Sequence, residues 1–451
     1  METWMKVKQT PTVRVVKAIL RILPRVNEDQ LLRFPIVRRN LERISHYPDG
    51  GDFLKGLLIQ VHRNIGRLSK NCLVKIAENL LFNEFIVAKT KRMEFFARYK
   101  FHPPFFLVLS PSMRCNLSCL GCYADKYDKG VELNTDEIHR LLDEAKAMGI
   151  YFITISGGEP FIRQDLLDIF AAHRDMFFQV FTNGTLINER VARALSELGN
   201  ILPAISIEGW EKETDARRGS GTFQKILAAM ARLKEEGVLF GFSATATRQN
   251  NELIISDEFV NFLAEQGCFI GWYFNYIPIG KESAPELMPT PQQRIHRIKR
   301  LRELRKKSTI LLADFFNDGP MVGGCIAVDR YLHINCRGDV EPCVFVHFSV
   351  DNVREKPLAT ILGSEFFHAI RRRQPYSFNC YRSCLITDHP QILRQVIGEC
   401  GAHPTHPDAD SILGTFAADF DRYAQAYKEM ADALWKEQTL SPKDRPFPGP
   451  S

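Results

Sequence analysis

Between residues 104 and 308, short apolar runs alternate with longer segments in which apolar residues recur every three or four positions. Short runs rich in β-branched and aromatic residues are typical of strands, and the three-to-four spacing is typical of amphipathic helices. The pattern predicts strands over 104–112, 151–158, 177–185, 201–209, 239–247 and 269–280. It predicts helices over 134–149, 165–173, 188–199, 222–237, 256–267 and 290–307.

These elements form six consecutive strand–helix units. Strands joined by helices pair in parallel with right-handed crossovers, which favours an open doubly wound sheet or a partial barrel. Polar, Gly-rich segments follow the strands, namely SPSMRCN, SGGEP, TNGT, SIEG, TATRQN and IPIG. Because the carboxyl ends of parallel strands lie at one edge, we expect these segments to converge on one site.

The region before these units is basic. Up to residue 105 the chain holds 20 Lys and Arg against 9 Asp and Glu. Residues 13–26 and 34–44 are predicted to form amphipathic helices with cationic faces, which suit an anionic membrane or an acidic partner. The same pattern is also typical of a helical cap whose charged face is simply solvated.

Beyond residue 308 the regular alternation ends. We predict a short β-hairpin region at 323–348, helices at 358–373 and 415–438, and a Pro-rich loop at 403–410. The sequence therefore divides into a basic helical N-terminal region (1–103), an α/β core (104–308), a small Cys-rich extension (309–400) and a C-terminal helix with its tail (401–451).

The composition excludes some classes of protein. A content of 45% hydrophobic and 25% charged residues is ordinary for a globular protein. The N-terminus lacks the apolar core of a signal peptide, and the uncharged stretches are too short to span a bilayer. We expect a cytoplasmic protein, with the basic helices as the candidate for peripheral membrane contact. The basic–aromatic stretch FFARYKF is too short to indicate nucleic-acid binding.

Most of the 11 cysteines are clustered, and in a reducing compartment clustered cysteines more often serve metal or redox chemistry than form disulfides. Cys115, Cys119 and Cys122 lie in one loop, MRCNLSCLGCYAD, after the first predicted strand. A structural zinc ion takes four closed ligands, and this loop offers three with no histidine nearby. Three thiolates are better suited to an iron–sulfur cluster in which one iron stays open to a substrate or cofactor.

The spacing Cys-x3-Cys-x2-Cys at this position resembles the radical SAM superfamily. Later segments resemble the other motifs of that family in order: SGGEP at 156–160, SIEG…TDARRG at 206–219 and YIPIG at 276–280. The resemblance covers roughly residues 104–308 and implies a partial (β/α)6 TIM-like barrel. One departure is visible: the residue before the third cysteine is often aromatic in that family, and here it is Gly121, with Tyr123 on the other side.

The resemblance also implies a mechanism. Cys115, Cys119 and Cys122 would hold a 4Fe–4S cluster that cleaves S-adenosylmethionine to a 5′-deoxyadenosyl radical, which abstracts hydrogen from a substrate. The cluster would need a one-electron donor such as flavodoxin or ferredoxin. The residues that would bind S-adenosylmethionine are Gly157, Gly158 and Glu159 at the ammonium, Ser206 and Arg218 at the carboxylate and ribose region, and Asn183 at the ribose.

A second group of cysteines lies in the C-terminal extension. Cys325, Gly338 and Cys343 have the spacing C-x12-G-x4-C, which resembles the start of the SPASM-type auxiliary-cluster regions that follow many radical SAM barrels. Too few cysteines follow for the two-cluster version of that region, so we expect one auxiliary cluster. Its predicted ligands are Cys325, Cys343 and Cys384, with Cys380 as the fourth and Cys336 as the next candidate.

The resulting hypothesis is a radical SAM enzyme that acts on a peptide or a lipid. Its auxiliary cluster would carry away an electron or bind the substrate. A tetrapyrrole or another small metabolite is the alternative substrate. An alternative of a different class is a non-catalytic iron–sulfur electron-transfer protein. Such carriers are usually small and saturate every iron with cysteine, which argues against them here.

Overall fold

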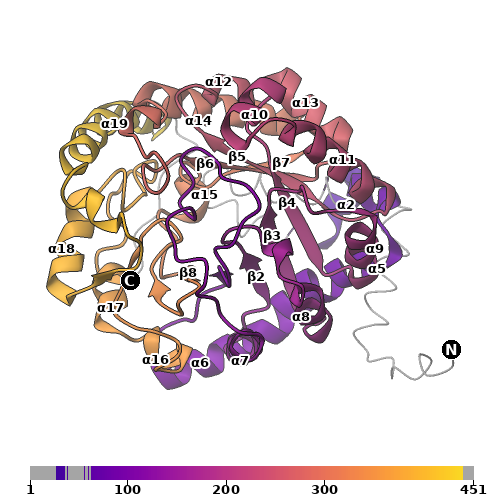
Figure 1. Ribbon diagram of the computed structural model, residues 1–451, viewed down its shortest axis with the longest axis horizontal. Helices are drawn as coiled ribbons and strands as arrows, with labels where there is room; N and C mark the ends of the chain where they lie inside the picture. Colours follow the sequence, from indigo (N-terminus) through magenta and orange to yellow (C-terminus); the bar gives the residue numbers. More distant parts are fainter. Residues whose placement is uncertain (1–26, 36–37, 39–54, 56–58, 60–61, 440–451) are drawn as a thin grey trace.

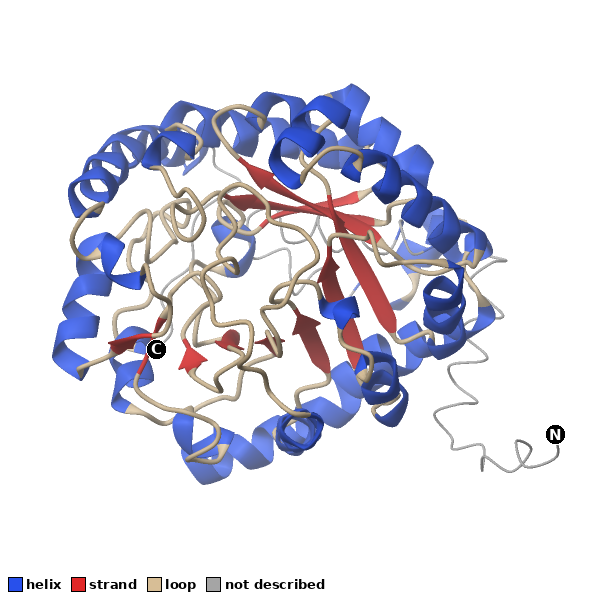
Figure 2. Ribbon diagram, in the orientation of Figure 1, coloured by secondary structure: helices blue, strands red, loops and turns tan. Residues whose placement is uncertain are grey.

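The computed structural model describes residues 27–35, 38, 55, 59 and 62–439. A curved nine-stranded sheet lies inside a ring of helices (Figures 1 and 2). Its order is β7-β6-β5-β4-β3-β2-β1-β8-β9, and all neighbours are parallel except β8 and β9. The strands are β1 Phe106–Leu109, β2 Phe152–Ile155, β3 Phe177–Thr182, β4 Ile201–Ser206, β5 Gly241–Ala246, β6 Ile270–Asn275, β7 Leu311–Asp314, β8 Tyr331–Ile334 and β9 Val340–Glu341.

The helices cover the outer face of the sheet (Figure 2). Those of the core are α7 Thr135–Ala147, α8 Leu166–Ala172, α9 Glu189–Leu198, α10 Glu211–Arg218, α11 Thr222–Glu235, α12 Asn251–Ile254, α13 Asp257–Gln266 and α14 Pro291–Lys307. Those that follow are α15 Gly319–Val322, α16 Leu358–Ile361, α17 Glu365–Arg371, α18 Pro390–Cys400 and α19 Ala417–Thr439. The six predicted strand–helix units are all present, and the prediction of a partial barrel is confirmed.

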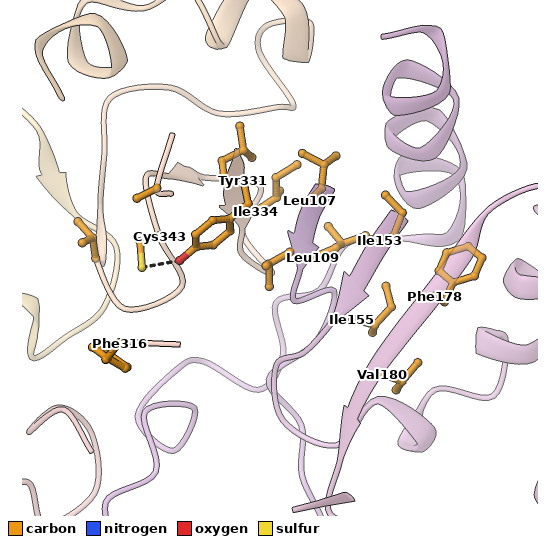
Figure 3. Close-up of a cluster of buried hydrophobic side chains, with 14 of the residues drawn as sticks. Leu107, Leu109, Ile153, Ile155, Phe178, Val180, Phe316, Tyr331, Ile334 and Cys343 are labelled. Carbon is orange, nitrogen blue, oxygen red and sulfur yellow. Dashed lines mark hydrogen bonds between the residues drawn. The ribbon is translucent and has the colours of Figure 1, made fainter. Parts of the chain in front are cut away.

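Local sequence accounts for both kinds of element. Asn134 caps α7, and its side chain and that of Glu137 form a reciprocal capping box. In the strands, successive side chains point to opposite faces. Phe178 and Val180 of β3 pack outward under the helices, whereas Gln179 and Phe181 line an inner cavity. Figure 3 shows this outward layer continuing across β1 and β2.

A helical segment closes the amino-terminal end of the barrel. It runs through α5 (Lys70–Lys75), the π-helix Ile76–Val87 and α6 (Ala88–Tyr99). Apolar side chains from 68–80 pack against the first residues of several strands. Asn79 donates to the Met176 carbonyl at 2.9 Å and so fixes this segment to the chain before β3. The carboxyl end of the barrel is left for the site.

Strand β7 and the β1–β8 pairing were not predicted, and two predicted helices lie wholly or mostly outside the described residues. The four-residue strands β7 and β8 extend the sheet past residue 308, and β8 pairs in parallel with β1. Only the antiparallel β8–β9 pair was expected, because short runs give weak signals and the β1–β8 pairing is not local. The predicted helix 13–26 and most of 34–44 lie outside the described residues.

The C-terminal part packs around the side of the barrel. The predicted helix at 358–373 is interrupted between α16 and α17, and α18 was not predicted. The predicted helix at 415–438 is α19. A two-residue strand, β11 (His403–Pro404), pairs with β10 (Phe348–Ser349). No helix in the described part of the chain is long and apolar enough to cross a membrane.

A buried arginine fastens α14 to the sheet. The fully buried guanidinium of Arg297 donates from Nε to Oδ2 of Asp314 in β7 at 2.7 Å and to Asn251 in α12 at 2.6 Å. It also donates to Asn275 at the end of β6. A buried charge is tolerated only when it is paired, so these contacts fix α14 against β6 and β7.

Replacing Arg297 with Met should destabilise the protein by about 3–5 kcal/mol, because Asp314 would stay buried without its partner. Lys299→Met is the control on the same helix, since its pair with Glu437 is exposed and 3.5 Å long. That change should cost less than about 1 kcal/mol. Chemical denaturation followed by circular dichroism measures both, and equal midpoints would contradict this role of Arg297.

Candidate active site

A cavity of about 690 Å³ lies at the carboxyl end of the barrel. Its wall contains both groups of cysteines that the sequence singled out, which lie in segments more than 200 residues apart. The loop after β1 contributes Cys115, Cys119 and Cys122, and the C-terminal extension contributes Cys325, Cys343 and Cys384. The two groups therefore face one common space.

Neighbouring segments hold the cysteine loop. The backbone N–H of Leu120 donates to the Arg217 carbonyl, and that of Gly121 to the Lys281 carbonyl, each at 2.9 Å. Asn183, which follows β3, donates to Asn116 in the loop at 2.9 Å. The structure thus places the predicted ribose contact Asn183 in the cavity wall, where it also ties β3 to the loop.

Gly121 is required by a close aromatic contact. Its φ is +67°, and a Cβ added there would lie 2.4 Å from a ring carbon of Tyr276, which follows β6. The Tyr276 ring therefore stands beside the position where an aromatic side chain was expected. Tyr123, on the other side of Cys122, contacts the Ser156 hydroxyl at 3.0 Å, and burial raises its pKa to about 12.

The two glycines of SGGEP allow the chain to pass against the cysteine loop. A Cβ on Gly157 would lie 2.2 Å from the Ser112 carbonyl oxygen, and one on Gly158 would lie 2.1 Å from that of Arg114. Both glycines line the cavity, as predicted for S-adenosylmethionine contacts. No side chain could replace their hydrogens without displacing the loop.

The carboxylate of Glu159 is hydrogen-bonded to other residues of the chain. Its carboxylate accepts hydrogen bonds from the Thr182 hydroxyl and the Asn183 backbone N–H, both at 2.7 Å, and from the Phe161 N–H at 3.1 Å. The side chain is buried, and burial raises the pKa of its carboxyl. Glu159 is outside the cavity wall, unlike Gly157 and Gly158. The contact between Glu159 and the ammonium of S-adenosylmethionine stays a prediction.

A buried carboxylate that the sequence analysis missed organises the arginines. Glu208 accepts hydrogen bonds from Arg217 at 2.7 Å and Arg218 at 3.0 Å, and from the Thr245 N–H at 3.0 Å. Burial would raise the pKa of Glu208, but the two guanidiniums outweigh it and lower that pKa. The acidic residue in SIEG was the available signal. Arg218 and Ser206, predicted for S-adenosylmethionine, both line the cavity.

The loop thiols fit an iron–sulfur cluster in their chemistry. Burial raises the pKa of Cys115 and Cys122, and Arg217 and Arg218 act in the opposite direction on Cys122. Thiolate ligands beside two guanidiniums are a suitable setting for an anionic cluster. Among the described residues, no three His, Cys, Asp or Glu side chains converge as on a single metal ion. In a cluster, by contrast, each thiolate binds its own iron.

The second group of cysteines is buried beside tyrosine and phenylalanine side chains. Tyr331 in β8 donates its hydroxyl to Cys343 Sγ at 2.7 Å (Figure 3). Burial raises the pKa of Cys325 to about 12 and also raises that of Cys384. The two other predicted ligands, Cys380 and Cys336, are absent from the cavity wall.

A cluster of phenylalanines lies between the end of β6 and Cys343. Phe274, Phe315 and Phe345 pack against one another with ring centroids 5.4–6.1 Å apart, and Phe316 lies 5.2 Å from Phe345. We call these four residues the phenylalanine wall. All four line the cavity, so a substrate there would contact aromatic rings in preference to water.

Residues 403–410, predicted as a Pro-rich loop, hold the cysteine loop in place. His406 Nδ1 accepts from the Asp408 N–H and Nε2 donates to the Tyr123 carbonyl, each at 2.9 Å. Burial lowers the pKa of His406 to about 4, so the ring is neutral at pH 7. Asp408 also pairs with Lys126 at 2.8 Å. His406 and Tyr123 are about 280 residues apart in sequence, so the local pattern of hydrophobic and polar residues could not predict this contact.

A buried polar network lies behind the loop. Glu341 in β9 accepts hydrogen bonds from Asn335 at 3.0 Å and from Thr405, and it pairs with His333 in β8. The second ring nitrogen of His333 contacts the Ser110 hydroxyl at 2.7 Å. Burial would raise the pKa of Glu341, but the His333 charge and hydrogen bond dominate and lower it to about 2. The network ties β1, β8 and β9 to the segment around residue 405.

Comparison of the sequence with known proteins shows the family to which this chain belongs. The sequence profile of the radical SAM superfamily matches residues 109–252, and that of an iron–sulfur cluster-binding domain, SPASM, matches residues 325–385. The mycofactocin maturase MftC of Mycobacterium tuberculosis is 30% identical over 269 residues, 55% of this chain and 68% of that one. The chain belongs to the radical SAM superfamily.

Other known proteins are also similar to this chain. Fe-coproporphyrin III synthase of Methanosarcina barkeri is 28% identical over 60% of this chain and 77% of that protein. The crystal structure of Streptococcus suis SuiB bound to S-adenosylmethionine has a TM-score of 0.52 at 22% identity, over 63% of this chain and 71% of SuiB. The cofactors of this radical SAM enzyme are therefore a 4Fe–4S cluster, S-adenosylmethionine and an auxiliary iron–sulfur cluster.

Replacing His406 with Ala should weaken retention of the radical SAM cluster, because the Tyr123 carbonyl loses its donor and the loop its clamp. His403→Ala is the matched control in the same segment, since His403 is exposed. We expect the visible absorbance of the reconstituted cluster to decay at least about threefold faster in His406→Ala only, a change of about 0.6 kcal/mol. Equal decay in both variants would contradict the role of His406 in holding the cysteine loop.

Replacing Glu208 with Gln should weaken S-adenosylmethionine binding. The neutral amide would leave Arg217 and Arg218 without their shared buried anion, a loss worth about 2–5 kcal/mol in such pairs. The dissociation constant, measured by equilibrium dialysis, should rise at least about tenfold, or about 1.4 kcal/mol. Glu211→Gln, at an exposed position on α10, should leave it unchanged.

Proposed function

We propose that this enzyme abstracts a hydrogen atom from an apolar group of a peptide held against the phenylalanine wall. The observation that carries the proposal is that all the residues predicted for S-adenosylmethionine except Glu159 line the same largely apolar cavity as Cys325, Cys343 and Cys384. A group placed there lies between the site that generates the radical and the site that can accept an electron.

The residues of the chain divide the work by position. Cys115, Cys119 and Cys122 hold the cluster, which, when bound with S-adenosylmethionine and reduced, supplies the 5′-deoxyadenosyl radical. The predicted roles of Gly157, Gly158, Ser206, Arg218 and Asn183 in binding S-adenosylmethionine are part of this proposal, and all of them line the cavity. The phenylalanine wall excludes water from the reacting groups.

The charges in the cavity wall favour a peptide over a tetrapyrrole. The two arginines of the wall, Arg217 and Arg218, both donate to Glu208. Arg218 is also the proposed contact of S-adenosylmethionine, so these two side chains leave few N–H donors for the several carboxylates of a substrate such as a coproporphyrin. Relatives named PqqA peptide cyclase and mycofactocin maturase also support a peptide.

A tetrapyrrole is the second candidate. Three relatives are named AdoMet-dependent heme synthase, with 26–27% identity. Large aromatic side chains suit a planar macrocycle as well as a peptide side chain. A lipid would meet the same wall, and the basic N-terminal region remains the proposed site of contact with an anionic membrane. The electron donor is proposed to be a flavodoxin or ferredoxin.

Anaerobic incubation with dithionite and S-adenosylmethionine should yield 5′-deoxyadenosine. The triple variant Cys115→Ala/Cys119→Ala/Cys122→Ala should form at least about 100-fold less, because it lacks the ligands of the cluster that would pass the electron to S-adenosylmethionine. That change corresponds to about 2.7 kcal/mol or more. Cys400→Ala, outside the cavity wall, is the control and should match the wild type. Equal product from the triple variant would contradict the assignment of these cysteines.

The substrate class is tested by what stimulates that reaction. The additions are a pool of apolar synthetic peptides, iron coproporphyrin III, and vesicles containing phosphatidylglycerol. We expect only the peptides to increase 5′-deoxyadenosine formation. Stimulation by the porphyrin alone would replace the peptide with a tetrapyrrole, and stimulation by vesicles together with co-sedimentation would replace it with a lipid.

A further inference from the structure

Few large apolar side chains of this protein are exposed, and most of these lie near one another. The exposed ones among the described residues are Phe34, Met93, Phe96, Phe105 and Phe378. Met93 and Phe96 belong to α6, and Phe105 directly precedes β1. Exposed apolar residues that are scattered singly are ordinary, whereas a contiguous group of them marks an interaction surface. The three residues on α6 and before β1 are between 42% and 54% exposed and form such a candidate.

Contacts with their neighbours make these three residues one surface. The guanidinium of Arg92 lies over the Phe105 ring, 4.5 Å from its centroid, and donates to the Phe105 carbonyl at 3.3 Å. Phe96 stacks on His102, with ring centroids 4.5 Å apart. Met93 precedes Phe96 by three positions, and residues so spaced are neighbours on the surface of a helix. The exposed apolar side chains thus form a row along α6 that continues to the residue before β1.

The rim of this row is basic. Lys89 lies four positions before Met93 and therefore on the same side of α6, and Lys100 directly follows the helix. Lys89, Arg98 and Lys100 are exposed, and none of them forms an ion pair within the described part of the chain. Glu94 is the sole acidic residue of α6. We call the following six residues the α6 surface: Lys89, Met93, Phe96, Arg98, Lys100 and Phe105.

The remaining basic residues of α6 hold the helix against its neighbours. Lys91 donates to the carbonyl of Lys146 in α7 at 2.7 Å, and Arg92 pairs with Glu84 at 2.6 Å. Phe95 is buried in the main hydrophobic core. Figure 1 shows α6 beside α7 at the periphery of the molecule. The helix therefore presents the α6 surface outward and cannot turn it toward the core without breaking these contacts.

We propose that the α6 surface seats the enzyme on an anionic lipid bilayer. Its apolar side chains suit the boundary between headgroups and acyl chains, and its bases suit anionic headgroups. The excess of 20 Lys and Arg over 9 Asp and Glu up to residue 105 adds charge of the same sign. An acidic protein would meet the same charges. Lysine is depleted in protein interfaces, however, whereas from an apolar boundary its long side chain reaches the headgroups.

The position of the α6 surface separates membrane contact from catalysis. Helix α6 belongs to the helical segment that closes the amino-terminal end of the barrel, and none of its residues lines the cavity at the carboxyl end. The bilayer therefore holds the enzyme and does not supply the group that reacts. The α6 surface thus gives the proposed membrane contact of the basic N-terminal region its residues, and its role goes beyond the proposed reaction.

The test is co-sedimentation of the full chain with phosphatidylcholine vesicles, prepared with or without phosphatidylglycerol. The wild type should bind only the vesicles that contain phosphatidylglycerol, and added salt should weaken this binding because it screens the charges. Met93→Ser/Phe96→Ser and Lys89→Glu/Lys100→Glu should each lower the partition coefficient at least about tenfold. Circular dichroism checks that each variant is folded.

Each of these variants has a matched control elsewhere on the molecule. Phe378→Ser removes an exposed phenylalanine outside the α6 surface, and Lys212→Glu/Lys225→Glu reverses two exposed lysines on α10 and α11. Both controls should bind the vesicles as the wild type does. If the α6 variants bind as well as the wild type, or if the controls lose as much binding, the proposal fails.

Other outcomes would also overturn the proposal. One is a wild type that binds neither kind of vesicle. Another is light scattering in which Met93→Ser/Phe96→Ser converts a dimer into a monomer, since the surface would then join two copies of this chain. Co-sedimentation needs neither a cluster nor S-adenosylmethionine. Failure of the proposed function would appear separately, as peptides that do not increase 5′-deoxyadenosine formation.

Discussion

The parallel pairing of β1 with β8 is the contact on which the rest of the site depends. Only four residue pairs make it, from Phe106 with Tyr331 to Leu109 with Ile334. Yet it joins segments more than 220 residues apart. The cysteine loop follows β1, and Cys325 and Cys343 lie on either side of β8 in the sequence. Without this pairing the loop thiols and the C-terminal thiols would not lie beside the same cavity. With it, they share one cavity at the edge where the strands end.

Buried charges stabilise this short pairing. The chain Ser110–His333–Glu341 runs from the end of β1 through β8 to β9, and it is continued by Thr405 from the C-terminal segment. At the other edge of the sheet, Arg297 and Asp314 join α14 to β7. Such groups are costly to bury unless fully paired, and each has its partners in a single arrangement. They therefore specify how the last strands and helices close around the site.

The sequence predicted the core because its information is local. Strands such as 177–185 and capped helices such as 134–149 are marked by nearby residues, and the order of the motifs along the chain placed the cysteine loop and the glycines together. What it missed is contact between distant segments. The β1–β8 pairing and the His406 contact to Tyr123 depend on which surfaces meet after folding. The periodicity of hydrophobic residues along the chain carries no information about such contacts. The contacts of Glu208 with Arg217 and Arg218 span only nine and ten residues, and the acidic residue in SIEG was the signal for them.

The contact between Gly121 and Tyr276 has a consequence for how such a site can diverge. The ring fills the space that a side chain at residue 121 would need, 2.4 Å from the nearest ring carbon. An aromatic residue at 121 would demand a small residue at 276, and a small residue at 276 alone would leave a hole beside Cys122. A single substitution at either position would therefore give an overpacked or underpacked protein. Across homologous sequences, these two positions should therefore exchange bulk together rather than vary independently.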